Sequence, residues 1–499
     1  MLTCKASHKF SLTKNPCEAV KLLAKTLLLI GVGQLPFYNS DRLYGFGIRA
    51  WQFALPLLRA GHHVVLATCE FGVQRETNIN IDYQTDPSSW GDLEHVALPE
   101  PNVRNTNLIL TRLEDLIARK RPDAIITAGS SIATNLASYL KTDVPVWMDM
   151  FGDLFAEVQA KSPFMRDALQ IEHFHQTLSR VLLRGDCFSV VSEMQRGAAI
   201  GQLGLIGRLN RYTLSEELVW TIPCALNGEI SPVRGESILR GGEVNSSDFL
   251  VLCSGGFNTW ADVDTLFLAI EGAMEKNRRV QCVVTGGAIA GHHEDGYNRF
   301  RSLISKSAYE SRFHLMGWVS NEDVAQLTLE CDLGINIDLP IYESVLGSRN
   351  RFLYWMQCGV PILSTLTTEI SHLLSREGLI VGIPTGDEKL ATAKILEMAA
   401  NPAKAKARAV KAKRFAYEYF SFESTTQPLL NWVENPVRAS DNVEREFRGG
   451  QPFHRVDEMW LNWAFPGRDD KSGIIPRFRR PIIKTKPQGK SWWQRLWGV

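Results

Sequence analysis

The chain has 499 residues, of which 44% are hydrophobic and 22% charged; this is ordinary for a globular protein and allows two or three domains. A formal net charge of +1 argues against a nucleic-acid-binding protein that acts through overall charge. The 9 cysteines include no Cys-x-x-Cys pair, so we expect reduced, mostly buried thiols in a cytoplasmic protein. Apolar runs such as Leu27–Val32 are too short to cross a bilayer, and Lys21 and Lys25 interrupt any N-terminal secretory signal.

The first half of the chain alternates between apolar strands and segments of helical spacing. The first strand is predicted at Thr26–Val32, and a helix over Ile48–Ala60 ends at Gly61, a typical C-cap residue. The other predicted elements are strands at Val64–Thr68, Pro122–Thr127, Val144–Met150, Phe188–Val191 and Val219–Ile222, and a helix at Ser130–Leu140. Strands that alternate with helices predict a parallel, doubly wound sheet.

The same pattern begins again after a linker, near residues 225–247, that is rich in glycine, serine and charge. Its predicted elements are a strand that runs into glycines at Asp248–Gly256, a helix at Asp264–Glu275, and strands at Val280–Val284, Phe313–Met316, Leu333–Ile337 and Val360–Leu363. The fold class is therefore α/β, with two doubly wound Rossmann-like domains. We place them at residues 1–230 and 231–412, followed by a helix that crosses back at 413–435 and a tail at 436–499.

The most informative motif extends from Leu346 to Ser364. Arg349 and Arg351 stand at the start of a predicted helix whose end is marked by Gly359. A helix N-terminus attracts phosphate through its free N–H groups and its dipole, and guanidinium groups bind phosphate oxygens in pairs. Glu343, just before this segment, can accept hydrogen bonds from sugar or ribose hydroxyls. The combination predicts a nucleotide-sugar site.

With this motif the chain resembles glycosyltransferase family 4, retaining enzymes of the GT-B architecture, over roughly residues 26 to 430. The resemblance implies two Rossmann-like domains that face a central cleft. Glu343 stands where the first acidic residue of the family's donor site is expected, whereas Tyr354 occupies the place of the second glutamate. Residues 348–351, Ser-Arg-Asn-Arg, resemble a variant that places arginines early in the helix, and Ser348 is included in the predicted donor site.

The resemblance also implies two glycine loops at the donor phosphates. In the first loop, Gly33 and Gly47 would let the backbone approach the donor, with Arg49 opening the following helix; a plain strand-to-helix turn is the alternative. The second loop lacks the family's usual arginine or lysine. The groups expected to contact the diphosphate there are Gly256, Asn258 and Thr259.

Two further positions are implied to support the nucleotide. Gly286 and Gly287 follow a predicted strand and resemble the strand end that carries the nucleotide. Trp318 stands in the loop against which the base would lie, where it either stacks on the base or belongs to the core.

Two carboxylates follow the strand at Val144–Met150. Because the carboxyl end of a parallel strand faces the cleft, we predict that Asp149 or Asp153 contacts the acceptor and assists deprotonation of its hydroxyl. Capping of a helix N-terminus by Asp153 is the alternative. No metal site is predicted, since His173 and His175 lack a third ligand at metal spacing.

The tail has a composition of its own. Residues 471–499 contain eight lysines and arginines as well as apolar residues. Three tryptophans, Trp492, Trp493 and Trp497, lie near the end of this segment. Basic residues attract anionic lipid headgroups and tryptophan prefers the bilayer interface, so one reading is peripheral attachment to an anionic membrane. The other is a tail that packs across its own domains.

We therefore predict a metal-independent, retaining glycosyltransferase without a cofactor. It would transfer a sugar from a nucleotide diphosphate sugar to an acceptor hydroxyl, on a glycan or a lipid-linked glycan. Two alternatives stay open: a catalytically silent GT-B partner subunit, which the missing second glutamate and loop cation favour, and a nucleotide-sugar isomerase of similar design, which would need an acid–base carboxylate pair in the cleft.

Overall fold

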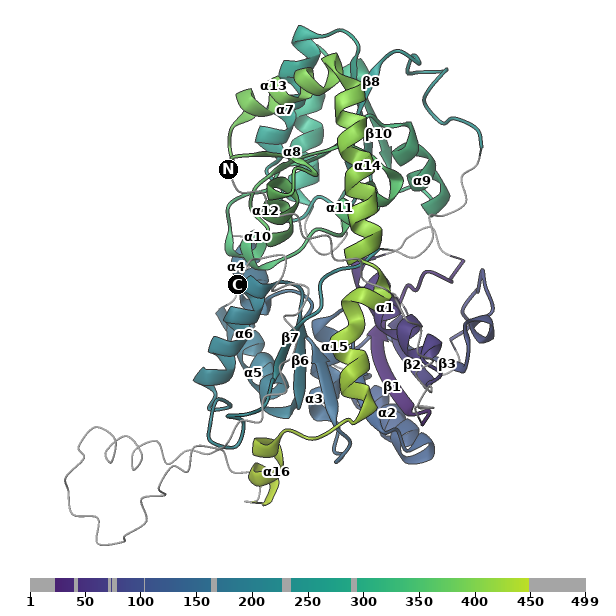
Figure 1. Cartoon of the computed structure of the whole chain (residues 1–499), viewed down its shortest axis with the longest axis vertical. Helices are drawn as coiled ribbons and strands as arrows, with labels where there is room; N and C mark the ends of the chain where they lie inside the picture. The colour runs from purple at the N-terminus through teal and green to yellow at the C-terminus, as the bar shows by residue number, and fades with distance from the viewer. Residues whose placement is uncertain are drawn as a thin grey trace, which may run out of the picture.

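The protein consists of two parallel β-sheets flanked by helices, one from each half of the chain (Figure 1). This computed structural model describes residues 23–39, 44–70, 73, 79–102, 104–162, 168–226, 235–288 and 294–447. The predicted α/β class with two doubly wound units is confirmed. The predicted domain bounds stay predictions, and the tail at 471–499 lies outside the described residues.

The first sheet has seven strands in the order β3-β2-β1-β4-β5-β6-β7. Its strands are β1 Thr26–Val32, β2 His63–Glu70, β3 Leu93–Pro99, β4 Ala124–Thr127, β5 Val146–Asp149, β6 Cys187–Val190 and β7 Val219–Thr221. Its helices are α1 Gly45–Arg59, α2 Thr106–Lys120, α3 Ser131–Tyr139, α4 Leu154–Lys161, α5 Ala168–Arg184 and α6 Glu193–Leu205. The central strand β1 is buried from Leu27 to Val32, because helices cover both faces of a parallel sheet.

The second sheet has six strands in the order β10-β9-β8-β11-β12-β13. Its strands are β8 Phe249–Ser254, β9 Val280–Thr285, β10 Phe313–Gly317, β11 Leu333–Asn336, β12 Ile362–Thr365 and β13 Val381–Ile383. Its helices are α7 Val263–Lys276, α8 Asp295–Ile304, α9 Asn321–Glu330, α10 Tyr342–Leu346, α11 Asn350–Cys358, α12 Glu369–Arg376 and α13 Glu388–Ala400. In each sheet the chain first adds strands on one side of its first strand and then on the other. The change of side lies between β1 and β4 in the first sheet and between β8 and β11 in the second. Ligands of such sheets bind outside the carboxyl ends of the strands at these points.

Two helices connect the domains near the C-terminus of the described chain. Helix α14 (Pro402–Tyr419) runs along the second domain, and α15 (Phe422–Glu434) continues along the first (Figure 1). The sequence predicted one helix here, but the Ser421 hydroxyl caps α15 by accepting a hydrogen bond from the Ser424 amide at 3.1 Å. Gln52 on α1 donates to the Thr425 hydroxyl at 3.0 Å, which fixes α15 to the first domain. A last helix, α16, spans Ser440–Phe447.

Two strands, β3 and β13, were not predicted from the sequence, and neither were several helices, α2 and α13 among them. Most of β3 is only half-buried at the edge of its sheet, and β13 has three residues, so neither has the continuous apolar run of a central strand. None of the helices among the described residues is both long and apolar enough to cross a membrane. The same residues contain no group of three or more His, Cys, Asp or Glu side chains that could hold a metal ion.

Candidate functional site

Glycine-rich backbone lies at the carboxyl ends of β8 and β9. The Gly255 amide donates to the Thr285 carbonyl at 3.0 Å, and the Phe257 amide donates to the Gly287 carbonyl at 3.1 Å. Gly286 has φ +85°, and a Cβ atom there would lie 2.5 Å from the Gly255 carbonyl oxygen. Glycine is therefore required at 286, because the two loops meet there backbone to backbone. The predicted second glycine loop and the predicted glycines after β9 thus lie side by side.

Arg351 reaches this glycine loop from another element. It lies in the first turn of α11, and its Nη2 donates to the Gly256 carbonyl at 3.3 Å. No ion pair joins Arg351 to any residue that the structure describes, and burial lowers the pKa of its guanidinium from the usual value. A small cavity of about 20 Å³ beside it is lined by Ser254, Asn336 and Asp338, among others. The second glycine loop contains no arginine or lysine of its own, and Arg351 of α11 places a cation beside it.

Arg349 is placed differently from Arg351. Its side chain is 2% exposed; Nε donates to Asp338 at 2.8 Å, and Nη2 donates to Glu343 at 3.3 Å. The guanidinium also lies 4.6 Å from the ring centre of Trp260. These contacts correct the expectation of a paired arginine clamp, because the charge of Arg349 is already matched by two carboxylates. Arg349 instead anchors the loop that leads into α11.

Glu343 lies on α10, where the second domain meets α4 of the first. Burial raises the pKa of its carboxyl, while Arg349 and, more weakly, Lys161 on α4 oppose that rise. Ser348 contributes its carbonyl, which accepts from Arg349 at 3.1 Å. The structure thus brings Glu343, Ser348 and Arg349 together around one buried guanidinium, beside the domain interface.

The remaining predicted residues of the second domain lie around the same strand ends. The Asn258 side-chain oxygen accepts from the Thr259 amide at 2.8 Å, so this part of Asn258 shapes its own loop. Trp318 is 37% exposed; its indole nitrogen donates to the Ala288 carbonyl at 3.1 Å, and its ring lies 6.3 Å from that of Tyr44 in the first domain. Trp318 is therefore no core residue, and its stacking on a base stays a prediction.

The two glycines of the first loop serve close packing. A Cβ atom on Gly47 would lie 1.8 Å from the Gln34 carbonyl oxygen, and one on Gly33 would lie 2.1 Å from a carboxylate oxygen of Glu70. Gly47 lets α1 begin directly against the loop that follows β1. Gly33 makes room for Glu70, and contact of either glycine with a donor phosphate stays a prediction.

Arg49 and Asp149 form an ion pair in the core of the first domain. Both side chains are 0% exposed; Nε and Nη2 of Arg49 donate to the two carboxylate oxygens of Asp149 at 3.0 and 2.8 Å. Ser189 and the Gly129 amide also donate to Asp149, and Arg49 donates to the Pro223 carbonyl. The expectation that Asp149 faces the cleft is thus corrected, as is that of an Arg49 side chain open to phosphate. Arg49 and Asp149 have protein groups as partners, and their ion pair joins α1 to β5.

Asp153 is the N-cap of α4. One carboxylate oxygen accepts from the Ala156 amide at 2.8 Å, and the other accepts from the Gln202 side chain at 2.9 Å. The capping alternative of the sequence analysis is confirmed. Both oxygens are occupied by protein donors, so a role of Asp153 as a base toward an acceptor gains no support from this placement.

Sequence reasoning missed a buried polar network beside Gly33. The Tyr38 hydroxyl donates to Glu70 at 2.8 Å, the Thr68 hydroxyl donates to Glu70 at 2.5 Å and contacts Nε2 of His95 at 2.7 Å, and Nδ1 of His95 contacts Tyr83 at 2.7 Å. Burial raises the pKa of Glu70 and lowers that of His95 to about 4. No spacing pattern could reveal this network, because its members come from β2, β3 and two loops.

The two domains meet through the N-terminus of α6. Ser192 donates to the Leu346 carbonyl at 2.9 Å, and the Met194 amide donates to the Glu369 carboxylate of the second domain at 3.0 Å. Burial raises the pKa of Glu369 to about 7 despite these amide contacts. A carboxylate is favourable at a helix N-terminus, and here the helix and the carboxylate belong to different domains.

Solved structures with this arrangement of two domains identify the fold. The chain is similar to sucrose-phosphate synthase from Thermosynechococcus elongatus, with a TM-score of 0.62 and 14% identity over 82% of this chain and 98% of that one. It is also similar to HepE of Anabaena in complex with UDP-glucose, with a TM-score of 0.57 and 14% identity over 82% and 99% of the two chains. This chain has the GT-B fold.

Two further comparisons concern the GT-B chain. An E. coli structure described as trehalose-6-phosphate bound with UDP-2-fluoro glucose matches it with a TM-score of 0.60 and 10% identity over 83% and 100% of the chains. Residues 248–401, which include Arg349 and Arg351, match the family "Glycosyl transferases group 1". No curated protein matches the chain.

The buried ion pair gives a first prediction. Replacing Asp149 by alanine leaves the Arg49 charge buried without its carboxylate, which should lower the free energy of unfolding by about 3–5 kcal/mol. Urea denaturation followed by circular dichroism measures the change. The double variant Arg49→Met, Asp149→Leu is the control and should recover most of the loss. A loss of less than about 1 kcal/mol for Asp149→Ala would contradict a core role for the pair.

Glu369 gives a prediction on pH. Its pKa rises from an ordinary 4.5 to about 7 on folding, so its contribution to stability is complete below pH 4.5 and is lost as the pH rises through 7. Between pH 6 and pH 8 this carboxyl should cost about 1 kcal/mol of unfolding free energy. Urea titrations of wild type and Glu369→Gln at both pH values isolate the effect, since the variant lacks this titration. Parallel pH dependence of the two proteins would refute the assignment.

Proposed function

We propose that this GT-B protein is a retaining glycosyltransferase that transfers a sugar from a nucleoside diphosphate sugar to an acceptor hydroxyl of a glycan or lipid-linked glycan. The observation that carries the proposal is Arg351, a half-buried guanidinium at the second glycine loop with no ion pair to any described residue. A desolvated cation without a counterion favours an anionic ligand. The site lies at the switch point of the second sheet, where ligands of this fold class bind.

The start of α11 adds a second source of positive potential. No side chain caps this helix end, where Arg349 holds the N-cap position with an extended backbone. The free amides and dipole of such an end favour phosphate, and Arg351 lies within the same turn. In the proposed reaction, negative charge grows on the diphosphate as the bond to the sugar breaks. Fixed donors aimed at that charge lower the barrier, and this is the role we assign to Arg351 and the glycine-loop amides.

The surrounding residues have supporting roles in this scheme. Arg349 holds Asp338 and Glu343 in place, and Glu343 is the carboxylate that we assign to the donor sugar. Contact between the domains around α10 and α6 would exclude water that otherwise hydrolyses the donor. Similar structures hold UDP-glucose and UDP-2-fluoro glucose, so uridine nucleotides are the first donors to test.

The structure also bears on the two alternative functions, a nucleotide-sugar isomerase and a catalytically silent partner subunit. An isomerase would need an acid–base carboxylate pair in the cleft, and the hydrogen bonds that occupy Asp149 and Asp153 do not favour it. A silent partner subunit keeps its support from Tyr354 at the second glutamate position. A thermal-shift screen of nucleoside diphosphates and their sugars, followed by turnover of the best donor, separates a silent subunit from an enzyme.

Location at a membrane is a separate proposal. It rests on the basic residues and tryptophans of the tail at 471–499, which lies outside the described residues. A cytoplasmic protein peripherally attached to an anionic membrane would bring a lipid-linked acceptor within reach.

The donor site gives a third prediction. Replacing Arg351 by alanine removes a charge-assisted contact of about 1.5–3 kcal/mol, so UDP should bind roughly ten- to a hundredfold more weakly. Isothermal titration calorimetry measures the affinity. Arg414→Ala, which removes an exposed arginine of the same domain that lines neither cavity, is the control and should leave UDP affinity unchanged. Equal UDP affinity of wild type and Arg351→Ala would remove the basis of the proposal.

Glu343 gives a fourth prediction. The change to glutamine keeps an oxygen for the Arg349 contact but loses the charge, so turnover of the donor should fall about tenfold or more while the fold survives. Release of UDP from UDP-glucose measures turnover, and urea denaturation reports stability. Wild-type kinetics would show that the carboxylate serves packing alone. A drop in activity that merely follows a loss of folded protein would point the same way.

A further inference from the structure

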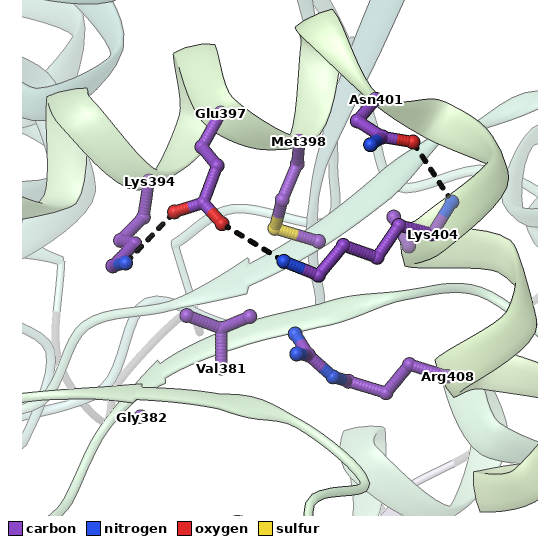
Figure 2. A pocket seen from close by; sticks show the side chains of 9 residues that line it. Val381, Gly382, Lys394, Glu397, Met398, Asn401, Lys404 and Arg408 are labelled. Carbon is purple, nitrogen blue, oxygen red and sulfur yellow. Dashed lines mark hydrogen bonds and ion pairs between the residues drawn. The ribbon is translucent and has the colours of Figure 1, made fainter.

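A second cavity lies in the second domain between β13, α13 and α14. Its volume is about 190 Å³, and it is lined by Val381, Gly382, Lys394, Glu397, Met398, Asn401, Lys404, Ala405 and Arg408 (Figure 2). None of these residues lines the small cavity beside Arg351. One water occupies about 30 Å³, so the space holds a polyatomic ligand rather than a single small ion.

The charges around this cavity do not cancel. Glu397 on α13 lies between two lysines (Figure 2). One of its carboxylate oxygens lies 2.8 Å from Nζ of Lys394, and the other lies 3.6 Å from Nζ of Lys404. Both lysines lower the pKa of Glu397, which is therefore ionised at neutral pH. Arg408 reaches in from α14 beneath Lys404, and no ion pair joins it to any residue in the described part of the chain (Figure 2). Three cations face one carboxylate, which leaves a net charge of +2.

The sequence of α14 concentrates further positive charge at this place. Residues 402–417 contain six lysines and arginines and no acidic residue before Glu418, in a chain whose net charge is +1. Lys404 lies in the first turn of α14, where Asn401 caps the helix by accepting from the Lys404 amide at 3.2 Å. The positive end of the helix dipole adds to the potential of the side chains.

We infer that this cavity is a binding site for a phosphate monoester, separate from the proposed donor site. A phosphate monoester carries close to two negative charges at pH 7, which matches the net charge of the cavity. Arg408 supplies a planar pair of donors suited to phosphate oxygens, and Lys404 supplies a point charge opposite it. The volume leaves room for a small group attached to the phosphate. Because α14 leads into α15, which is fixed to α1, a ligand here would bind to the element that links both domains.

Calorimetric titration with orthophosphate tests the site on the full-length protein. Arg408→Ala should weaken phosphate binding by about tenfold or more, since a charge-assisted contact is lost. Glu397→Gln should strengthen binding, because it removes the competing carboxylate; a misfolded variant could not show this gain. Lys411→Ala removes an exposed cation of the same helix that does not line the cavity, and it should change the affinity less than twofold, about the error of such a comparison.

A variant of the other site distinguishes the two cavities. Phosphate binding that survives Arg351→Ala but is lost in Arg408→Ala assigns the phosphate to this cavity, whatever the fate of the donor proposal. Binding lost only in Arg351→Ala, binding equal in wild type and Arg408→Ala, or no binding at millimolar phosphate would each overturn the inference. Glycerol 3-phosphate and phosphatidic acid vesicles then separate the sources: Arg408-dependent binding of either supports the site and shows whether the phosphate belongs to a soluble ester or a lipid headgroup.

Discussion

In each domain, a buried guanidinium that is held by a carboxylate at a strand end fixes the start of a helix. In the first domain Asp149, the last residue of β5, holds Arg49 of α1; in the second, Asp338 after β11 holds Arg349 before α11. Burial of such charges costs free energy unless partners are present in good geometry, so each pair tolerates little rearrangement. The starts of α1 and α11 are thereby fixed relative to the sheets.

This organisation divides the arginines by task. Arg49 and Arg349 have protein carboxylates as partners and position other groups, whereas Arg351 ends at a backbone carbonyl beside the glycine loop. A half-buried guanidinium without an ion pair of its own is suited to an anion that arrives and leaves during turnover. The donor proposal depends on this difference more than on the presence of arginines in the motif.

The contact between the domains carries its own electrostatics. Glu369 reaches the N-terminus of α6 across the interface, where its carboxylate accepts a hydrogen bond from the Met194 amide. The interface removes the Glu369 carboxyl from water, and this burial raises its pKa to about 7. Association of the domains and protonation at this interface are therefore linked. The phosphate cavity on α13 and α14 lies apart from these groups, on the helix that leads back to the first domain.

The sequence by itself determined the fold class, the central strands and the helix that carries the arginines. Continuous apolar runs such as Leu27–Val32 can only be buried between two layers, and Gly359 ends α11 with φ +71°, as a C-cap glycine does. Only the tertiary structure decided which charges are free. Asp149 and Arg49 lie a hundred residues apart, and Arg351 meets a loop almost a hundred residues before it. Whether a charge is neutralised depends on these long-range contacts, and no local spacing records them.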